Sequence, residues 1–97
     1  MSPRQFYIYV MTNRQHHVLY IGVTTDLRSR VAQHKAGSYP GVPTKYQLEK
    51  LIYYEAWETA DAVVDRAKQL RHWHRAWKLN LIKELNHDLR DLSGDLD

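Results

Sequence analysis

The sequence predicts a small α+β domain, in which a three-stranded, mostly antiparallel sheet is flanked by helices in the order strand-strand-helix-strand-helix-helix. Two segments rich in aromatic and β-branched residues lie close together near the N-terminus, and a third follows residue 46. Apolar residues recur at helical spacing between and after these segments. With 97 residues, the chain can form one core. We expect a single domain over residues 1–92 and a short acidic tail over residues 93–97.

The first two strands are expected to form a hairpin. Residues 5–11, QFYIYVM, and 18–23, VLYIGV, are typical of strands, and the polar segment between them is typical of a turn. If the hairpin is symmetric about the peptide that follows Arg14, Tyr9 lies directly opposite Tyr20 and the two phenols share one face of the sheet. The alternative is that these tyrosines only pack in the core.

A short helix and a loop should follow this hairpin. The helix is expected to start near Asp26 and to continue to Lys35, with Thr24 or Thr25 as its N-cap. Residues 36–46 contain two glycines and two prolines and indicate a loop. A loop of this length in so small a domain is typical of functional loops.

The rest of the chain predicts one more strand and two helices. Residues 48–57 have the composition of a strand, and Thr59 is placed to cap a helix that ends near Trp73. The stretch from Arg75 to about Asn86 has helical character.

Composition favours a cytoplasmic protein with a polyanionic partner. The chain has no cysteine, no apolar run of the roughly 20 residues that a membrane span requires, and no convincing signal peptide. We therefore expect no membrane partner. Residues 88–97 carry four Asp and one Arg, so the rest of the chain has a net charge of +6. Such a charge favours nucleic acid, although many globular domains carry it without such a partner.

Two further groups of residues are candidates for function. Arg30 and His34 are four positions apart and share one face of the first helix. The alternative is that this face is only solvated and charged, or that His34 is a core histidine. Basic residues between 68 and 78 alternate with Trp73 and Trp77, a mixture that suits nucleic acid. The alternative for the second group is that at least one tryptophan belongs to the core.

The order of these motifs resembles the GIY-YIG nuclease superfamily, in its small single-domain bacterial branch. Residues 7–9, Tyr-Ile-Tyr, correspond to the first motif with tyrosine in place of its glycine, and residues 20–22, Tyr-Ile-Gly, to the second. Arg30 stands eight residues after the second motif, where the family has an essential arginine, and His34 follows it. Asn86 corresponds to the closing asparagine of the family. The resemblance covers about residues 5–92.

The resemblance implies a DNA endonuclease that hydrolyses phosphodiester bonds with Mg²⁺ or Mn²⁺. Tyr9 would act as the general base on water, directly or through His34. Arg30 would favour the ionised phenol and bind the phosphate oxygens. Tyr20 would orient water or phosphate, and Asn86 would brace the site through hydrogen bonds.

One position departs from the family pattern. The metal-binding glutamate of the family corresponds to Ala67, and Asp65 and Asp61 lie elsewhere around the same helix. We expect the missing carboxylate to leave a gap in the wall of the site, to weaken metal binding and to impair this chain as an enzyme. The expected origin is a deliberate Glu→Ala substitution in an otherwise retained site. A natural loss, which would leave a DNA-binding module, is the alternative.

The expected substrate is DNA, with single-stranded or structured DNA favoured over a long duplex sequence, because exposed bases can stack on aromatic rings. Residues expected to bind it come from the loop, its edges and the basic stretch: Lys35, Tyr39, Lys45, Tyr46, Lys68, Arg71 and Arg75. A protein-interaction domain whose tyrosines belong to the core is a further alternative.

Overall fold

The structure, a computed structural model, describes residues 5–96 and has the predicted order of elements. The strands form one antiparallel sheet in the order β2-β1-β3. The bounds of the strands and helices are β1 Phe6–Thr12, β2 Tyr20–Thr24, α1 Leu27–Lys35, β3 Lys50–Trp57, α2 Ala60–His72 and α3 Arg75–Leu85. Two short 3₁₀ turns, η1 at Thr44–Tyr46 and η2 at Ser93–Asp95, complete the fold.

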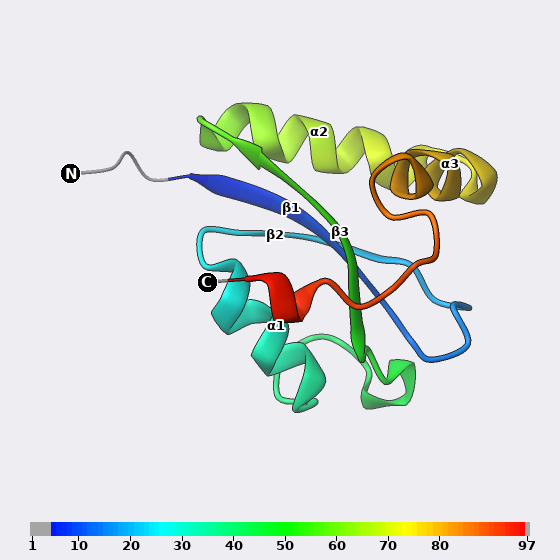
Figure 1. The fold of residues 1–97 in the computed structure, drawn as a ribbon. Helices are drawn as coiled ribbons and strands as arrows, with labels where there is room; N and C mark the ends of the chain where they lie inside the picture. The colour runs from blue at the N-terminus through cyan, green and yellow to red at the C-terminus, as the bar shows by residue number, and fades with distance from the viewer. Residues whose placement is uncertain (1–4, 97) are drawn as a thin grey trace.

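The central strand β1 divides the core into two layers. Its side chains alternate between the faces of the sheet, so that Ile8 and Val10 belong to one apolar cluster and Tyr9 and Met11 to the other. Figure 1 shows α2 and α3 on one side of the sheet and α1 on the other. We call these sides the α2 face and the α1 face.

The predicted register of the hairpin is wrong. Tyr9 pairs with Gly22, and Tyr20 pairs with Met11. The cause is a turn centred later in the chain, in which the Oδ1 of Asn13 accepts hydrogen bonds from the backbone of residues 17 and 18 at 2.8 and 3.2 Å. Because the pairing shifts by two residues, no side chain changes face. The prediction that the two phenols share one face is therefore confirmed.

The predicted N-cap of α1 is also wrong. Asp26, and neither of the threonines before it, caps the helix, because its Oδ1 accepts a hydrogen bond from the backbone of Ser29 at 3.1 Å. The hydroxyl of Thr24 instead accepts from the backbone N–H of Asp26 at 3.0 Å, which shapes the turn before the helix. The predicted cap of α2 is confirmed, since the hydroxyl of Thr59 accepts from Ala62.

After α3, the chain returns across the α1 face of the sheet, and the η2 turn lies beside α1 (Figure 1). The backbone N–H of Leu92 donates to the carbonyl of Leu51 at 2.7 Å, and Leu92 and Leu96 pack in the apolar cluster of this face. The residues expected to be a tail thus pack against the domain as far as Leu96. None of the helices between residues 5 and 96 has the length and apolar character needed to cross a bilayer.

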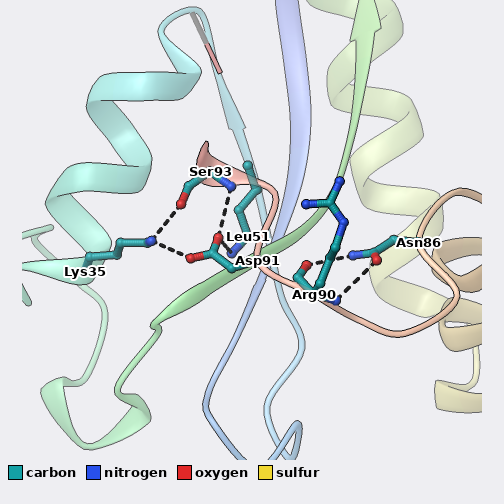
Figure 2. A network of polar contacts seen from close by, with 6 residues as sticks. All are labelled: Lys35, Leu51, Asn86, Arg90, Asp91 and Ser93. Atoms are coloured by element: carbon teal, nitrogen blue, oxygen red, sulfur yellow. Dashed lines mark hydrogen bonds and ion pairs between the residues drawn. The ribbon is translucent and has the colours of Figure 1, made fainter. Parts of the chain in front are cut away.

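Figure 2 shows the polar contacts that hold this returning segment. Lys35, at the end of α1, donates to the Oδ2 of Asp91 at 2.6 Å and to the hydroxyl of Ser93 at 2.7 Å. The Oδ1 of Asp91 accepts from the backbone N–H of Leu51 at 3.1 Å. One carboxylate therefore joins α1, β3 and the C-terminal segment.

Candidate functional site

Four aromatic rings meet on the α1 face. The ring of His34 lies 5.5 Å from that of Tyr9, 5.0 Å from that of Tyr20 and 4.8 Å from that of Tyr39, measured between centroids. Arg30 completes the group, with its Cζ 4.2 Å from the centroid of the Tyr39 ring. We call these five residues the tyrosine cluster. They come from β1, β2, α1 and the loop that follows α1.

Gly22 makes room for the most deeply buried member of the cluster. An added Cβ at position 22 would lie 2.3 Å from the Cζ of Tyr9 and 2.3 Å from its hydroxyl oxygen. The Tyr9 ring therefore lies across the backbone of the neighbouring strand. Only glycine permits this approach, because the missing side chain lets the phenol come close to the backbone.

The hydroxyl of Tyr9 and the Nε2 of His34 form a buried hydrogen bond of 2.8 Å. Tyr9 is fully buried, and His34 is 4% exposed. Burial raises the pKa of Tyr9 well above its usual value, although the neighbouring charge of Arg30 opposes this effect. Burial, together with Arg30, lowers the pKa of His34. Both groups are therefore neutral near pH 7, and the phenol can donate its proton to an imidazole nitrogen.

This outcome corrects the expected electrostatics of Tyr9. We expected Arg30 to favour the ionised phenol, but burial outweighs that charge and keeps the phenol protonated. The guanidinium is itself positioned by the protein, since its Nη1 donates to the carbonyl of Val23 at 3.3 Å. Arg30 remains half-buried, in contact with the ring of Tyr39 at the surface of the cluster.

Asn86 does not join the tyrosine cluster. Its amide nitrogen donates to the carbonyls of Ile52 and Arg90 at 3.0 and 2.8 Å, and its Oδ1 accepts from the backbone N–H of Arg90 at 3.2 Å. Asn86 thus braces β3 and the C-terminal segment, and Figure 2 shows its contacts with Arg90. We expected Asn86 to brace the site to which Tyr9 belongs, but its hydrogen bonds instead join the end of α3 to β3 and to Arg90.

Ala67 is a core residue of the α2 face. Its side chain is fully buried in the same apolar cluster as Ile8 and Val10, whereas Tyr9 belongs to the cluster of the α1 face. The expected gap in the wall of the site is therefore absent, because the methyl group fills a packed position on the other side of the sheet. Between residues 5 and 96 no set of three or more His, Cys, Asp and Glu side chains could hold a metal ion. The described part of the chain thus offers no ready set of ligands for a divalent cation.

Three of the basic residues expected to bind DNA contact the protein itself. Arg71 donates to the carbonyl of Ile21 through Nε and Nη2 at 3.3 and 3.0 Å. Arg75 donates to the carbonyl of His17 at 2.9 Å and also to that of the residue before it. Lys35 pairs with Asp91. These contacts stabilise the hairpin and the C-terminal segment.

The other expected DNA-binding residues lie in two separate places. Tyr39 belongs to the tyrosine cluster, and Tyr46 is half-buried against the apolar cluster of the α1 face. Lys45 is exposed in the η1 turn, and Lys68 is exposed on α2. Trp73 packs against the core, as expected for at least one tryptophan, whereas Trp77 is 57% exposed.

The sequence reasoning missed a polar network on the α2 face. Glu55 accepts hydrogen bonds from Trp57 at 2.8 Å and from Arg66 at 3.0 Å, and also from the hydroxyl of Tyr53. The sequence could have predicted this network, because residues 53, 55 and 57 are every second residue of one strand and therefore lie on the same face of the sheet. The network ties β3 to α2.

Comparisons with known proteins agree with this architecture. The model of the GIY-YIG catalytic domain family matches residues 5–80. A UPF0213 protein of Syntrophus aciditrophicus is 32% identical over 85 residues, which cover 87% of this chain and 94% of that protein. A UPF0213 protein of Streptococcus pyogenes serotype M5 is 37% identical over 65 residues, 66% of this chain and 68% of that protein.

A solved structure also shares the fold. The solution NMR structure of a UPF0213 protein from Bacillus halodurans superimposes with a TM-score of 0.54 and 20% sequence identity, and the match covers 87% of this chain and 88% of that chain. The predicted fold class is confirmed by the structure and by this likeness.

Proposed function

Because this chain belongs to the GIY-YIG catalytic domain family, a family of nucleases, we propose that it is a DNA endonuclease whose hydrolysis of phosphodiester bonds is impaired by Ala67. The observation that carries the proposal is the convergence of Tyr9, Tyr20, Arg30 and His34 on one face of the sheet. Membership of a nuclease family implies a nucleic-acid substrate.

In the proposed reaction, each residue of the tyrosine cluster that takes part has a separate role. Arg30 binds the non-bridging oxygens of the phosphate through charge-assisted hydrogen bonds. Water gives a proton to the oxygen of Tyr9 while the phenolic proton passes to the Nε2 of His34, which becomes an imidazolium. The hydroxide then attacks phosphorus, the bond to the leaving oxygen breaks, and that oxygen takes up a proton from solvent. A neutral His34 is suited to this role, because its lowered pKa leaves it free to accept the proton.

The absence of a carboxylate ligand, which the family has at the position of Ala67, limits the rate in this scheme. GIY-YIG nucleases generally depend on a divalent metal ion, for which we expect Mg²⁺ or Mn²⁺, and the described residues provide no ligand set for it. Arg30 is then the one cationic member of the cluster that can neutralise the phosphate. Loss of several kcal/mol of charge stabilisation slows a reaction by a few orders of magnitude.

The proposal is tested by comparing this chain with Ala67→Glu and Ala67→Gln in the presence of Mn²⁺. Single-stranded, duplex and branched DNA serve as substrates, with single-stranded or structured DNA expected to be cut best. Both variants place a polar side chain in an apolar cluster, so circular dichroism first establishes that each is folded. Position 67 lies on the α2 face, so a glutamate there would have to reach the tyrosine cluster from the other side of the sheet. Cutting by Ala67→Glu but not by Ala67→Gln would show that it does so and that the missing carboxylate is what impairs this chain. If neither the parent chain nor a folded Ala67→Glu variant cuts any of the three substrates, the enzyme proposal fails, whereas cutting by the parent chain alone would contradict only the role given to Ala67.

A second function is favoured by one observation, the packing of Ala67 in the core. A chain in which this position has become part of the apolar layer can bind nucleic acid without cutting it. Salt-dependent binding to oligonucleotides that depends on Arg30, together with an inactive and folded Ala67→Glu variant, would favour this function. The absence of any binding at low salt would instead favour a protein-interaction domain.

A further inference from the structure

A cavity of about 190 Å³ adjoins the tyrosine cluster, at the C-terminal end of α1 and along the loop that leads to β3. His34 and Tyr39 line it, so the cavity and the cluster share a wall. Pockets that enclose drug-sized ligands have volumes of roughly 300–1,000 Å³. The smaller volume here suits a single ring system.

The walls of the cavity suit a flat and partly apolar occupant. Val42, Pro43 and Leu48 contribute apolar surface beside the ring of Tyr39. The backbone at Gly37 and Gly41, on either side of Tyr39, has φ values of 70° and 85°, which glycine adopts without steric cost. The loop conformation therefore places Tyr39 at the boundary between the cavity and Arg30. Planar rings stack favourably on such a side chain.

Polar groups line another part of the same cavity. Gln47 and Glu49 have exposed side chains, and Gln47 has a left-handed backbone with φ of 50°, which is uncommon for a residue other than glycine. A glutamine amide both donates and accepts hydrogen bonds, and a carboxylate accepts them. These are the groups that proteins use to recognise the amino, imino and carbonyl groups along the edge of a nucleobase.

We propose that this cavity binds the base of an unpaired nucleotide adjacent to the phosphate held by Arg30. The inference rests on the proposed function, because it takes Arg30 as the phosphate ligand. The Cζ of Arg30 lies 4.2 Å from the centroid of the Tyr39 ring, so a base stacked on Tyr39 and a phosphate at Arg30 can belong to one nucleotide. A base must leave its duplex partner to enter such a cavity. The cavity therefore selects DNA with unpaired nucleotides.

The test uses pentanucleotides in which only the central residue carries a base and the other four are abasic. A fully abasic pentanucleotide is the reference, because it offers phosphates alone. Dissociation constants are measured by NMR titration of the whole chain at low salt. One stacked base contributes roughly 5- to 150-fold in affinity. We expect the base-bearing probes to bind at least about fivefold more tightly than the reference, with shifts in the amide signals of residues 47–49.

Substitutions in the cavity test whether it is the source of the tighter binding of the base-bearing probes. Tyr39→Ala should abolish it, and Tyr39→Phe should retain it because the ring remains. Glu49→Ala should reduce it, and Glu58→Ala is the matched control, since it removes an equal charge from an exposed position that does not line the cavity.

Three outcomes separate the two proposals. A gain in affinity that Tyr39→Ala removes supports the base-binding cavity. Equal binding of all probes, lost in Arg30→Ala, overturns the cavity and leaves the proposed phosphate site standing. In the third outcome, base-bearing probes still bind the Arg30→Ala variant more tightly than the abasic reference, which neither the variant nor the parent chain binds. That result shows base binding but overturns Arg30 as the phosphate ligand.

Discussion

Tyr9 lies across the backbone of Gly22, its partner on the neighbouring strand, so closely that a Cβ on the glycine would come within 2.3 Å of the phenol. The same ring reaches His34 through a buried hydrogen bond. The shape of the hairpin and the proton transfer that we propose therefore depend on one contact between two strands.

Gly22→Ala should force the Tyr9 ring out of its place. Overpacking of a core costs about 1–3 kcal/mol in the free energy of unfolding, and we expect a loss in that range. Denaturant unfolding measures it. The control is Gly94→Ala, because an added Cβ there meets nothing within 4 Å. Equal stability of the two variants would contradict the close approach of Tyr9.

His34 should make the stability of the domain sensitive to acid. Its pKa is lowered by burial and by Arg30, so the unfolded chain binds the proton more readily than the folded chain. The contribution of neutral His34 to the free energy of unfolding is complete above the pKa of about 6.5 in the unfolded chain. It is lost as the pH falls towards the lower pKa of the folded chain. We expect His34→Gln to reduce the decline in stability between pH 7.5 and pH 5. Parallel curves for the variant and the parent chain would rule out this contribution.

Asp91 should anchor the C-terminal segment. Burial alone would raise the pKa of its carboxyl, but hydrogen bonds from Lys35, Ser93 and Leu51 lower it to about 2. The stabilisation is therefore present above the unfolded pKa of 3.8 and is lost as the pH falls from there to about 2.

Asp91→Ala tests this anchor at neutral pH. We expect a loss of about 1–3 kcal/mol in the free energy of unfolding, because the backbone N–H of Leu51 loses its acceptor. The exposed Asp88, whose only described partner is the equally exposed His87, provides the comparison through Asp88→Ala. A similar loss for both variants would mean that the network of Figure 2 contributes nothing specific.

Asn86→Ala should lower stability without a specific effect on phosphate binding. Three hydrogen bonds to the backbone would be lost, two that Nδ2 donates to carbonyls and one that Oδ1 accepts from an N–H, and we expect a cost of about 2–3 kcal/mol. Binding of the abasic pentanucleotide, measured at a temperature where the variant is fully folded, should be unchanged. Weaker binding of the abasic pentanucleotide by the folded variant would show that Asn86 does contribute to the phosphate site.

Lys68 and Arg71 should respond differently to removal. Lys68→Ala removes an exposed charge, so we expect unchanged stability and, if α2 contacts DNA, a fall of about 0.7 in the slope of log affinity against log salt for single strands. Arg71→Ala should instead destabilise the hairpin, because the carbonyl of Ile21 loses two hydrogen bonds. Thermal unfolding and binding at three salt concentrations distinguish the two effects.

The sequence allowed the fold class and the core of the site to be predicted, because these depend on local periodicity. The order of the elements, the cap at Thr59 and the shared face of Tyr9 and Tyr20 follow from spacing along the chain. The pairing register does not, because the side chain of Asn13 moves the centre of the turn. The locations of Ala67 and Asn86 depend on which face of the sheet each helix covers, which the spacing within a helix leaves open.

The sheet keeps the two layers of side chains apart, and this separation bears on how the protein can be engineered. Ile8, Val63, Ala67 and Ile82 pack behind the sheet, whereas the phenols and His34 stand in front of it. Volume-conserving hydrophobic substitutions behind β1 should therefore change stability little while the reactive groups keep their positions. Apart from position 67, whose role the Ala67→Glu variant tests, residues of the α2 face can be repacked at constant volume, and those of the α1 face carry the proposed chemistry.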